Sequence, residues 1–169
     1  MELTVDQHVP ADTSTVLSVL TDEDFISFAG RGTQVATVDA TVTTTPEGDV
    51  VSAVRRSVPS AMIPPQARHF VGDSIEIRHV EAWSRPREGE NGPRYGTFAA
   101  EVAGAPVQVT GTVRLVPAAG SGTTLSYVLD VRASIPLVGG MVEQATGNVV
   151  RTALDQLGEA VRDWLDGER

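Results

Sequence analysis

The C-terminal segment constrains the fold of this chain more than any other part of the sequence. Between residues 137 and 165, apolar residues recur at steps of three and four, the spacing of one face of an α-helix. The residues of this face are Val138, Val142, Ala145, Val149, Ala153, Leu157, Ala160 or Val161, and Trp164. Such a helix would be about 44 Å long, more than a single strand can cover. We therefore expect a long terminal helix that packs across a curved sheet.

The preceding sequence reads mainly as strands. Alternation of polar and apolar residues predicts strands over residues 2–9, 34–43, 49–58, 74–84, 95–103, 107–116 and 123–134. Gly111 falls on the apolar side of one of these strands, where a glycine commonly marks a bend or a bulge. The pattern predicts an α+β fold in one domain, residues 1–169, with a curved seven-stranded antiparallel sheet wrapped on the terminal helix.

Two short helices are expected between the first two strands. Asp12 or Thr13 can cap the first, and the run at residues 21–24 (TDED) resembles a capping box that opens the second. Gly30 and Gly32 are expected to end this second helix.

Composition excludes several classes of protein and site. The net charge is -9, which argues against a nucleic-acid partner and against electrostatic docking on anionic lipid. Cysteine is absent, so disulfides and thiolate chemistry are excluded. The sequence begins without a signal-peptide pattern and contains no apolar run long enough to span a membrane. We therefore expect a cytoplasmic protein without stable membrane insertion.

The connections between the strands divide into a polar and an apolar set. In an antiparallel meander, successive connections lie at alternating ends of the sheet. Residues 44–49, 85–94 and 117–122 share one end and are polar, whereas residues 59–72, 103–106 and 134–140 share the other end and are apolar. The apolar connections either form a ligand entrance or pack on one another and plug that end.

Several polar residues are expected on the inner face of the sheet. His79 and Glu81 share the alternation of Trp83 and its apolar strand neighbours, and Tyr127 lies in the apolar set of a later strand. A buried carboxyl should be protonated or paired, and a buried tyrosine hydroxyl needs a partner. Glu81 or His79 is the partner we favour for Tyr127, with a ligand as the alternative.

One arginine is expected to join these residues. Arg55 and Arg56 are adjacent on a strand, so one of them points inward and can pair with Glu81. The cluster is then a structural ion pair or an anchor for the head group of a ligand, and less readily a general acid or base. The three histidines lie on different segments without a metal-binding spacing, so we expect no metal and no cofactor.

Several short stretches resemble a known family. They are Arg55-Arg56, residues 70–73 (FVGD), residues 81–83 (EAW), residues 104–107 (GAPV) and residues 135–140 (IPLVGG). Together with the order of elements they resemble the START-like superfamily (SRPBCC, the helix-grip fold), and most closely a bacterial family catalogued as domain of unknown function 2505. The resemblance implies a pocket between the sheet and the terminal helix and carries no catalytic motif.

The resemblance and the residues together predict a carrier or sensor that binds a small hydrophobic or lipid-like ligand. The candidate ligand-binding residues are Arg56, Met62, His79, Glu81, Trp83, Val109, Tyr127, Leu129, Val138 and Val142. The alternatives are an enzyme like the polyketide cyclases or dehydratases, which would use the polar residues of the cavity, and a protein-interaction module without a ligand. The oligomeric state stays open.

Overall fold

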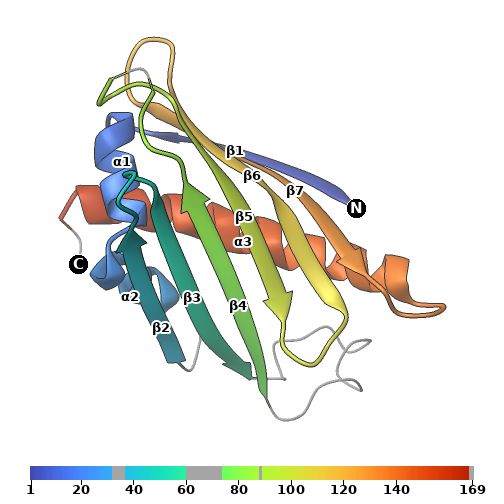
Figure 1. Cartoon of the computed structure of the whole chain (residues 1–169). Coiled ribbons are helices and arrows are strands. Elements are labelled where there is room, and N and C mark those ends of the chain that lie inside the picture. The colour runs from blue at the N-terminus through green and yellow to red at the C-terminus, as the bar shows by residue number, and fades with distance from the viewer. Residues whose placement is uncertain (32–36, 60–73, 88, 168–169) are drawn as a thin grey trace.

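The computed structural model describes residues 1–31, 37–59, 74–87 and 89–167 (Figure 1). The expected order of one strand, two helices, six strands and a long helix is confirmed. The elements are β1 (Glu2–Val9), α1 (Thr13–Leu20), α2 (Glu23–Arg31), β2 (Thr37–Thr44), β3 (Val50–Pro59), β4 (Ser74–Trp83), β5 (Arg94–Val102), β6 (Val107–Pro117), β7 (Thr123–Ala133) and α3 (Gly139–Leu165).

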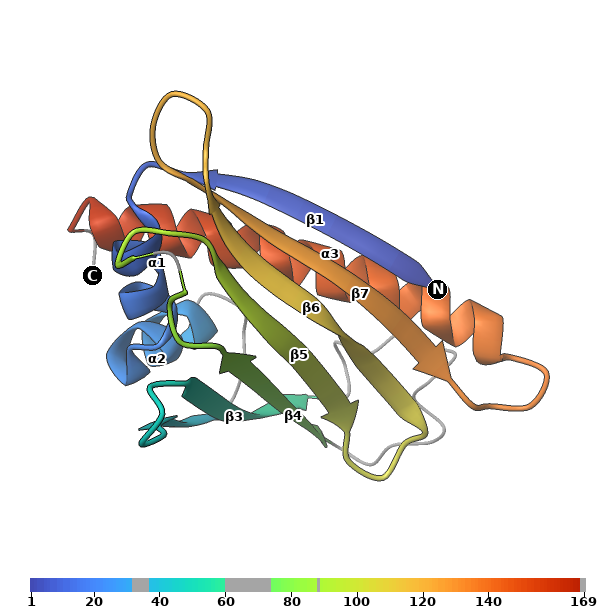
Figure 2. The same cartoon turned by 45° about the horizontal axis from the view of Figure 1, so that its top comes forward.

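The strands form one seven-stranded antiparallel sheet in the order β1-β7-β6-β5-β4-β3-β2. The sheet curves strongly, and α3 runs along its concave side (Figure 2). α3 packs chiefly against β1 and β7, and α2 packs against β2. The inner faces of β1 and β7 therefore lie against α3, and α1 packs on β6, whereas those of β3, β4 and β5 lie farther from α3.

The first short helix begins as its capping signal predicts, whereas the second is capped by Asp22 and not by a capping box that starts at Thr21, whose hydroxyl donates to Leu17. The carboxylate of Asp12 accepts a hydrogen bond from the backbone N–H of Thr15 at 2.8 Å, and Asp22 accepts from the N–H of Asp24 at 2.8 Å. The second helix, expected to end at Gly30 and Gly32, ends at Arg31; Gly30 lies within its last turn, and Gly32 lies outside the described residues. A side chain at Gly30 would collide with Val38 of β2, so this glycine allows close packing rather than ending the helix.

The predicted apolar face of α3 needs correction. Val149 is 51% exposed and Ala153 is also exposed, whereas the buried positions are Val142, Gly147, Leu154, Gly158 and Val161. The contact line runs through the two glycines because the helix approaches β1 closely there. A side chain at Gly147 would meet Met1, and one at Gly158 would meet Gln7.

Of the bend or bulge expected at Gly111, the bulge is absent. The register of β5, β6 and β7 runs through this residue without a slip, with Phe98, Gly111 and Leu129 side by side. An added Cβ would lie only 2.8 Å from the Cα of Leu129. The glycine is therefore needed for the close approach of β7 in the curved sheet.

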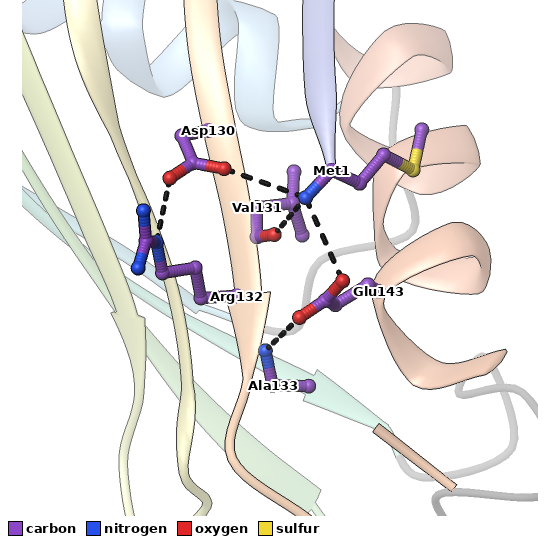
Figure 3. Close-up of polar contacts among 6 residues, drawn as sticks. All are labelled: Met1, Asp130, Val131, Arg132, Ala133 and Glu143. Atoms are coloured by element: carbon purple, nitrogen blue, oxygen red, sulfur yellow. Dashed lines mark hydrogen bonds and ion pairs between the residues drawn. The ribbon is translucent and has the colours of Figure 1, made fainter. Parts of the chain in front are cut away.

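A polar contact ties the start of β1 to β7 and to the first turns of α3 (Figure 3). The ammonium of Met1 donates to the carbonyl of Val131 at 2.7 Å and lies 3.4 Å from Asp130 Oδ1 and 3.5 Å from Glu143 Oε2. The other oxygen of Glu143 accepts from the N–H of Ala133 at 3.0 Å. A carboxylate of α3 thus fixes the helix against the end of β7.

The described connections at the apolar end pack on one another, as the plug alternative predicts. Val107, Ala133 and Val142 form a separate buried cluster, against which lie Val102, Ala105, Ile135 and Val138. Leu137 and Met141 project from this end into solvent. The apolar connection at residues 60–73 falls outside the described residues.

Candidate functional site

Glu81 is the centre of a buried polar cluster on the inner face of the sheet. It lies on β4, where alternation turns it inward, and is 7% exposed. The hydroxyl of Tyr127 donates to Glu81 Oε1 at 3.0 Å, and the indole N–H of Trp83 donates to Glu81 Oε2 at 3.2 Å. The protein partner expected for Tyr127 is thus confirmed as Glu81.

This contact crosses two intervening strands. Tyr127 lies on β7 and Glu81 on β4, so β5 and β6 separate them, roughly 14 Å across a flat sheet. Curvature of the sheet shortens that path, and glycines occupy inner positions of both intervening strands. A side chain at Gly96 would stand 3.1 Å from the Trp83 ring, and one at Gly111 would crowd Leu129. Gly96 therefore leaves room for the Trp83 ring, and Gly111 leaves room for the main chain of β7.

The environment of Glu81 favours its neutral form. Burial raises the pKa of its carboxyl to about 7, although the hydrogen bonds from Tyr127 and Trp83 and the charge of Arg56 act in the opposite direction. Burial and the neighbouring Glu81 also raise the pKa of the Tyr127 hydroxyl well above its ordinary value. Near pH 7 the Glu81 carboxyl is therefore partly protonated, and the Tyr127 hydroxyl keeps its proton.

His79 and Phe98 extend the cluster along the sheet. The His79 ring is stacked on Phe98 with ring centres 5.7 Å apart, and Phe98 meets the edge of Tyr127 at 6.0 Å. Burial, together with the charge of Arg56, lowers the pKa of His79 to about 3, so the ring is neutral at physiological pH. Sequence reasoning missed Phe98 as a site residue, although it lies directly opposite Glu81 in the register.

Arg56 is the inward-facing member of the arginine pair. It lies on β3 opposite Ile77, and its Nε is buried without a hydrogen-bond partner. Burial lowers the pKa of Arg56, and the charge of Glu81 raises it. The ion pair expected between Arg56 and Glu81 is wrong, because the described part of the chain contains no such pair and both oxygens of Glu81 are held by Tyr127 and Trp83.

The remaining predicted site residues lie away from this cluster or outside the described residues. Val109 and Leu129 are buried in the main core on β6 and β7. Val138 and Val142 belong to the separate apolar cluster at the start of α3. Met62 lies outside the described residues. The structure therefore brings together only the polar members of the predicted set.

Two surface hollows lie elsewhere in the described part of the chain. One, of about 480 Å³, is lined at the polar end by Glu47, Asp49, Ser84, Arg85 and Arg87. The other, of about 540 Å³, is lined by Arg78, Glu101 and residues 102–108 around the β5–β6 turn. Neither contains a residue of the polar cluster.

The chemistry that the cluster can support follows from the groups it contains. Among the residues that the structure describes, no three His, Asp or Glu side chains lie together as metal ligands would. No helix in the described ranges is long and apolar enough to cross a membrane. What the cluster offers is a guanidinium, a neutral imidazole and a carboxyl of raised pKa beside apolar side chains.

The fold is the helix-grip fold seen in START-like proteins. Human STARD10 has a TM-score of 0.63 to this structure, with 9% identity, and the match covers 99% of this chain and 65% of that chain. The structure of TTHA0849 from Thermus thermophilus has a TM-score of 0.60 and 18% identity, covering 95% of this chain and 97% of that chain. A START superfamily protein from Mycobacterium smegmatis has a TM-score of 0.53 and 18% identity, covering 100% and 98%.

The chain belongs to the family described as protein of unknown function (DUF2505), whose sequence pattern matches residues 4–165. No curated protein has significant sequence similarity to it. The structural relatives establish the fold. They do not establish an activity for this chain, because one fold hosts many functions.

Proposed function

We propose that this protein binds a small, largely apolar molecule against the inner faces of β3, β4 and β5. The observation that carries this proposal is the uneven burial of the inner face. Its side chains on β1, β6 and β7 are almost all buried, whereas those at the apolar end of β4 and β5 stay partly exposed. These half-buried residues are Ile75, Ile77, His79, Phe98, Ala100 and Val102.

An inner face that is apolar and yet reached by solvent is unfavourable when empty. Covering it with an apolar ligand removes that surface from water, at roughly 25 cal/mol per Å². The polar cluster borders this surface, since His79 stacks on Phe98 and lies opposite Ala100 in the register. Pockets of this composition, mostly apolar with a few converging polar groups, are typical of small-molecule sites.

The second candidate, an acid–base enzyme, rests on the same carboxyl. Glu81 has a pKa of about 7, which is a useful value for a general acid or base. Both of its oxygens, however, are engaged by Tyr127 and Trp83. Binding without chemistry therefore accounts for the described geometry with fewer rearrangements.

The test is to fill the proposed site and measure binding of the neutral apolar dye Nile red. Ala100→Trp places a large ring on the inner face of β5, and Ala99→Trp places the same ring on the exposed outer face of the adjacent position. We expect the wild type and the Ala99 variant to enhance the dye fluorescence and the Ala100 variant to lose that enhancement. Circular dichroism checks that both variants fold.

Native mass spectrometry of the wild type provides an independent measurement, since a co-purifying molecule appears as an added mass. Undiminished dye binding by the Ala100 variant would place the dye elsewhere. A wild type that carries no added mass and binds no dye would contradict the proposal. The interaction-module alternative, with exposed Leu137 and Met141 at the apolar end, would then stand.

A further inference from the structure

Arg56 differs from the arginines that surround it. On the outer face, Arg55 lies 3.7 Å from Glu76, and Arg78 donates to the same carboxylate at 2.5 Å. These guanidinium groups are more than half exposed. Arg56 lies on the opposite side of the same strand, is half-buried, and takes part in no ion pair within the described ranges. Of these three arginines, the least exposed is therefore the one without a counter-ion.

Within the part of the chain that the structure describes, the other residues of the inner face do not supply this counter-ion. Glu81 is held by Tyr127 and Trp83, and near neutral pH it is partly protonated because burial raises its pKa to about 7. His79 is neutral because burial lowers its pKa to about 3. Neither described group therefore forms an ion pair with Arg56, whose Nε stays without a hydrogen-bond partner. A buried cation without a partner is costly, and an anion placed beside it offsets that cost.

We propose that the ligand of this site is a monocarboxylate with an apolar body, and that its carboxylate pairs with the guanidinium of Arg56. This inference rests on the proposed binding function and specifies its ligand class. A planar carboxylate matches the fork of a guanidinium with two parallel hydrogen bonds. The apolar body would lie over the half-buried side chains of Ile75, Ile77 and Val102.

The geometry favours a single negative charge over a phosphate dianion. Arg56 is one cation, and Glu81 lies close enough for its charge to influence Arg56. A dianion would exceed the available positive charge and would repel the ionised fraction of Glu81. A neutral alcohol of the same length would bury the same apolar surface but would leave Arg56 unpaired.

The experiment compares two probes that differ only in their polar end, decanoic acid and 1-decanol. Each displaces Nile red from the wild type, from Arg56→Met and from the matched control Arg55→Met, whose guanidinium is on the outer face. We expect the wild type and the control to bind decanoate about 10-fold or more tightly than decanol, as is usual for charge-assisted hydrogen bonds. In Arg56→Met the two probes should bind equally, through loss of affinity for the acid alone.

Each outcome separates this inference from the proposed function. Equal binding of the acid and the alcohol by the wild type overturns the carboxylate inference and leaves apolar binding intact. Binding of neither probe overturns the proposed function itself. If Arg56→Met does not fold, Arg56→Lys retains the charge without the fork and should show an intermediate preference for the acid. An unchanged preference in that variant would contradict the paired geometry.

Discussion

Replacement of Glu81 by glutamine should change how the stability of this protein depends on pH. The pKa of this carboxyl is raised from 4.5 to about 7 in the folded chain. Between these values the unfolded chain has released its proton while the folded chain retains it. Ionisation therefore favours unfolding, and Glu81 removes about 3 kcal/mol of stability as the pH rises from 4.5 to 7. Glu81→Gln cannot ionise and lacks this dependence.

His79 contributes with the opposite sign over much of this range. Its pKa is lowered from 6.5 to about 3, so the unfolded chain binds a proton that the folded chain does not. Stability from His79 is present above pH 6.5 and is lost as the pH falls toward 3. Between pH 4.5 and 6.5 the two groups largely cancel in the wild type. The difference between wild type and variant is therefore the quantity to measure.

The assay is urea denaturation at a series of pH values from 4 to about 8, followed by circular dichroism at constant ionic strength. The free energy of unfolding of the wild type, minus that of Glu81→Gln, should fall by about 3 kcal/mol across this range. The control Glu159→Gln removes an exposed carboxylate of α3 and should follow the wild type. Parallel curves for wild type and Glu81→Gln would refute the assignment of a raised pKa to this carboxyl.

Three further variants test the packing around the site. Tyr127→Phe removes the hydrogen-bond donor to Glu81 and should lower the free energy of unfolding by about 1–3 kcal/mol. Because this hydrogen bond lowers the pKa of Glu81, its loss should raise that pKa above about 7, and a pKa that stays below 7 would contradict this role of Tyr127. Gly111→Ala places a methyl group against the main chain of Leu129 and should cost about 1–3 kcal/mol in the urea assay. Gly140→Ala meets nothing within 4 Å in the first turn of α3, so it should leave stability unchanged or raise it by up to about 1 kcal/mol. Equal losses in the two glycine variants would rule out close packing as the cause.

The composition of the site could be predicted from the sequence because a strand alternates with a period of two. Once Ile75 and Trp83 are assigned to the inner face, His79 and Glu81 must share it. The same rule does not say which side chain meets which. Tyr127 reaches Glu81 across two strands only because the sheet curves, and curvature is a property of the assembled sheet rather than of one strand. For this reason the partner of Glu81 was one of several possibilities, and its expected pairing with Arg56 was wrong.

The face of α3 was predicted less well for a related reason. Hydrophobic periodicity predicts buried positions at apolar residues such as Val149 and Ala153, and it predicts none at glycine. The helix instead meets β1 through Gly147 and Gly158, where the absence of a side chain lets the backbones approach. Close approach between two elements is visible only when both are in place.

Ligand binding at Arg56 should be linked to the protonation of Glu81. The charge of Arg56 lowers the pKa of Glu81, so a carboxylate that neutralises Arg56 should raise it. Binding of decanoate near pH 7 should then be accompanied by proton uptake, and by reciprocity its affinity should rise as the pH falls through 7 toward 6. Calorimetry in two buffers of different ionisation enthalpy measures this uptake directly. It should vanish in Glu81→Gln, whose side chain holds no titrating proton, whereas uptake of equal size in that variant would assign the linkage to another group.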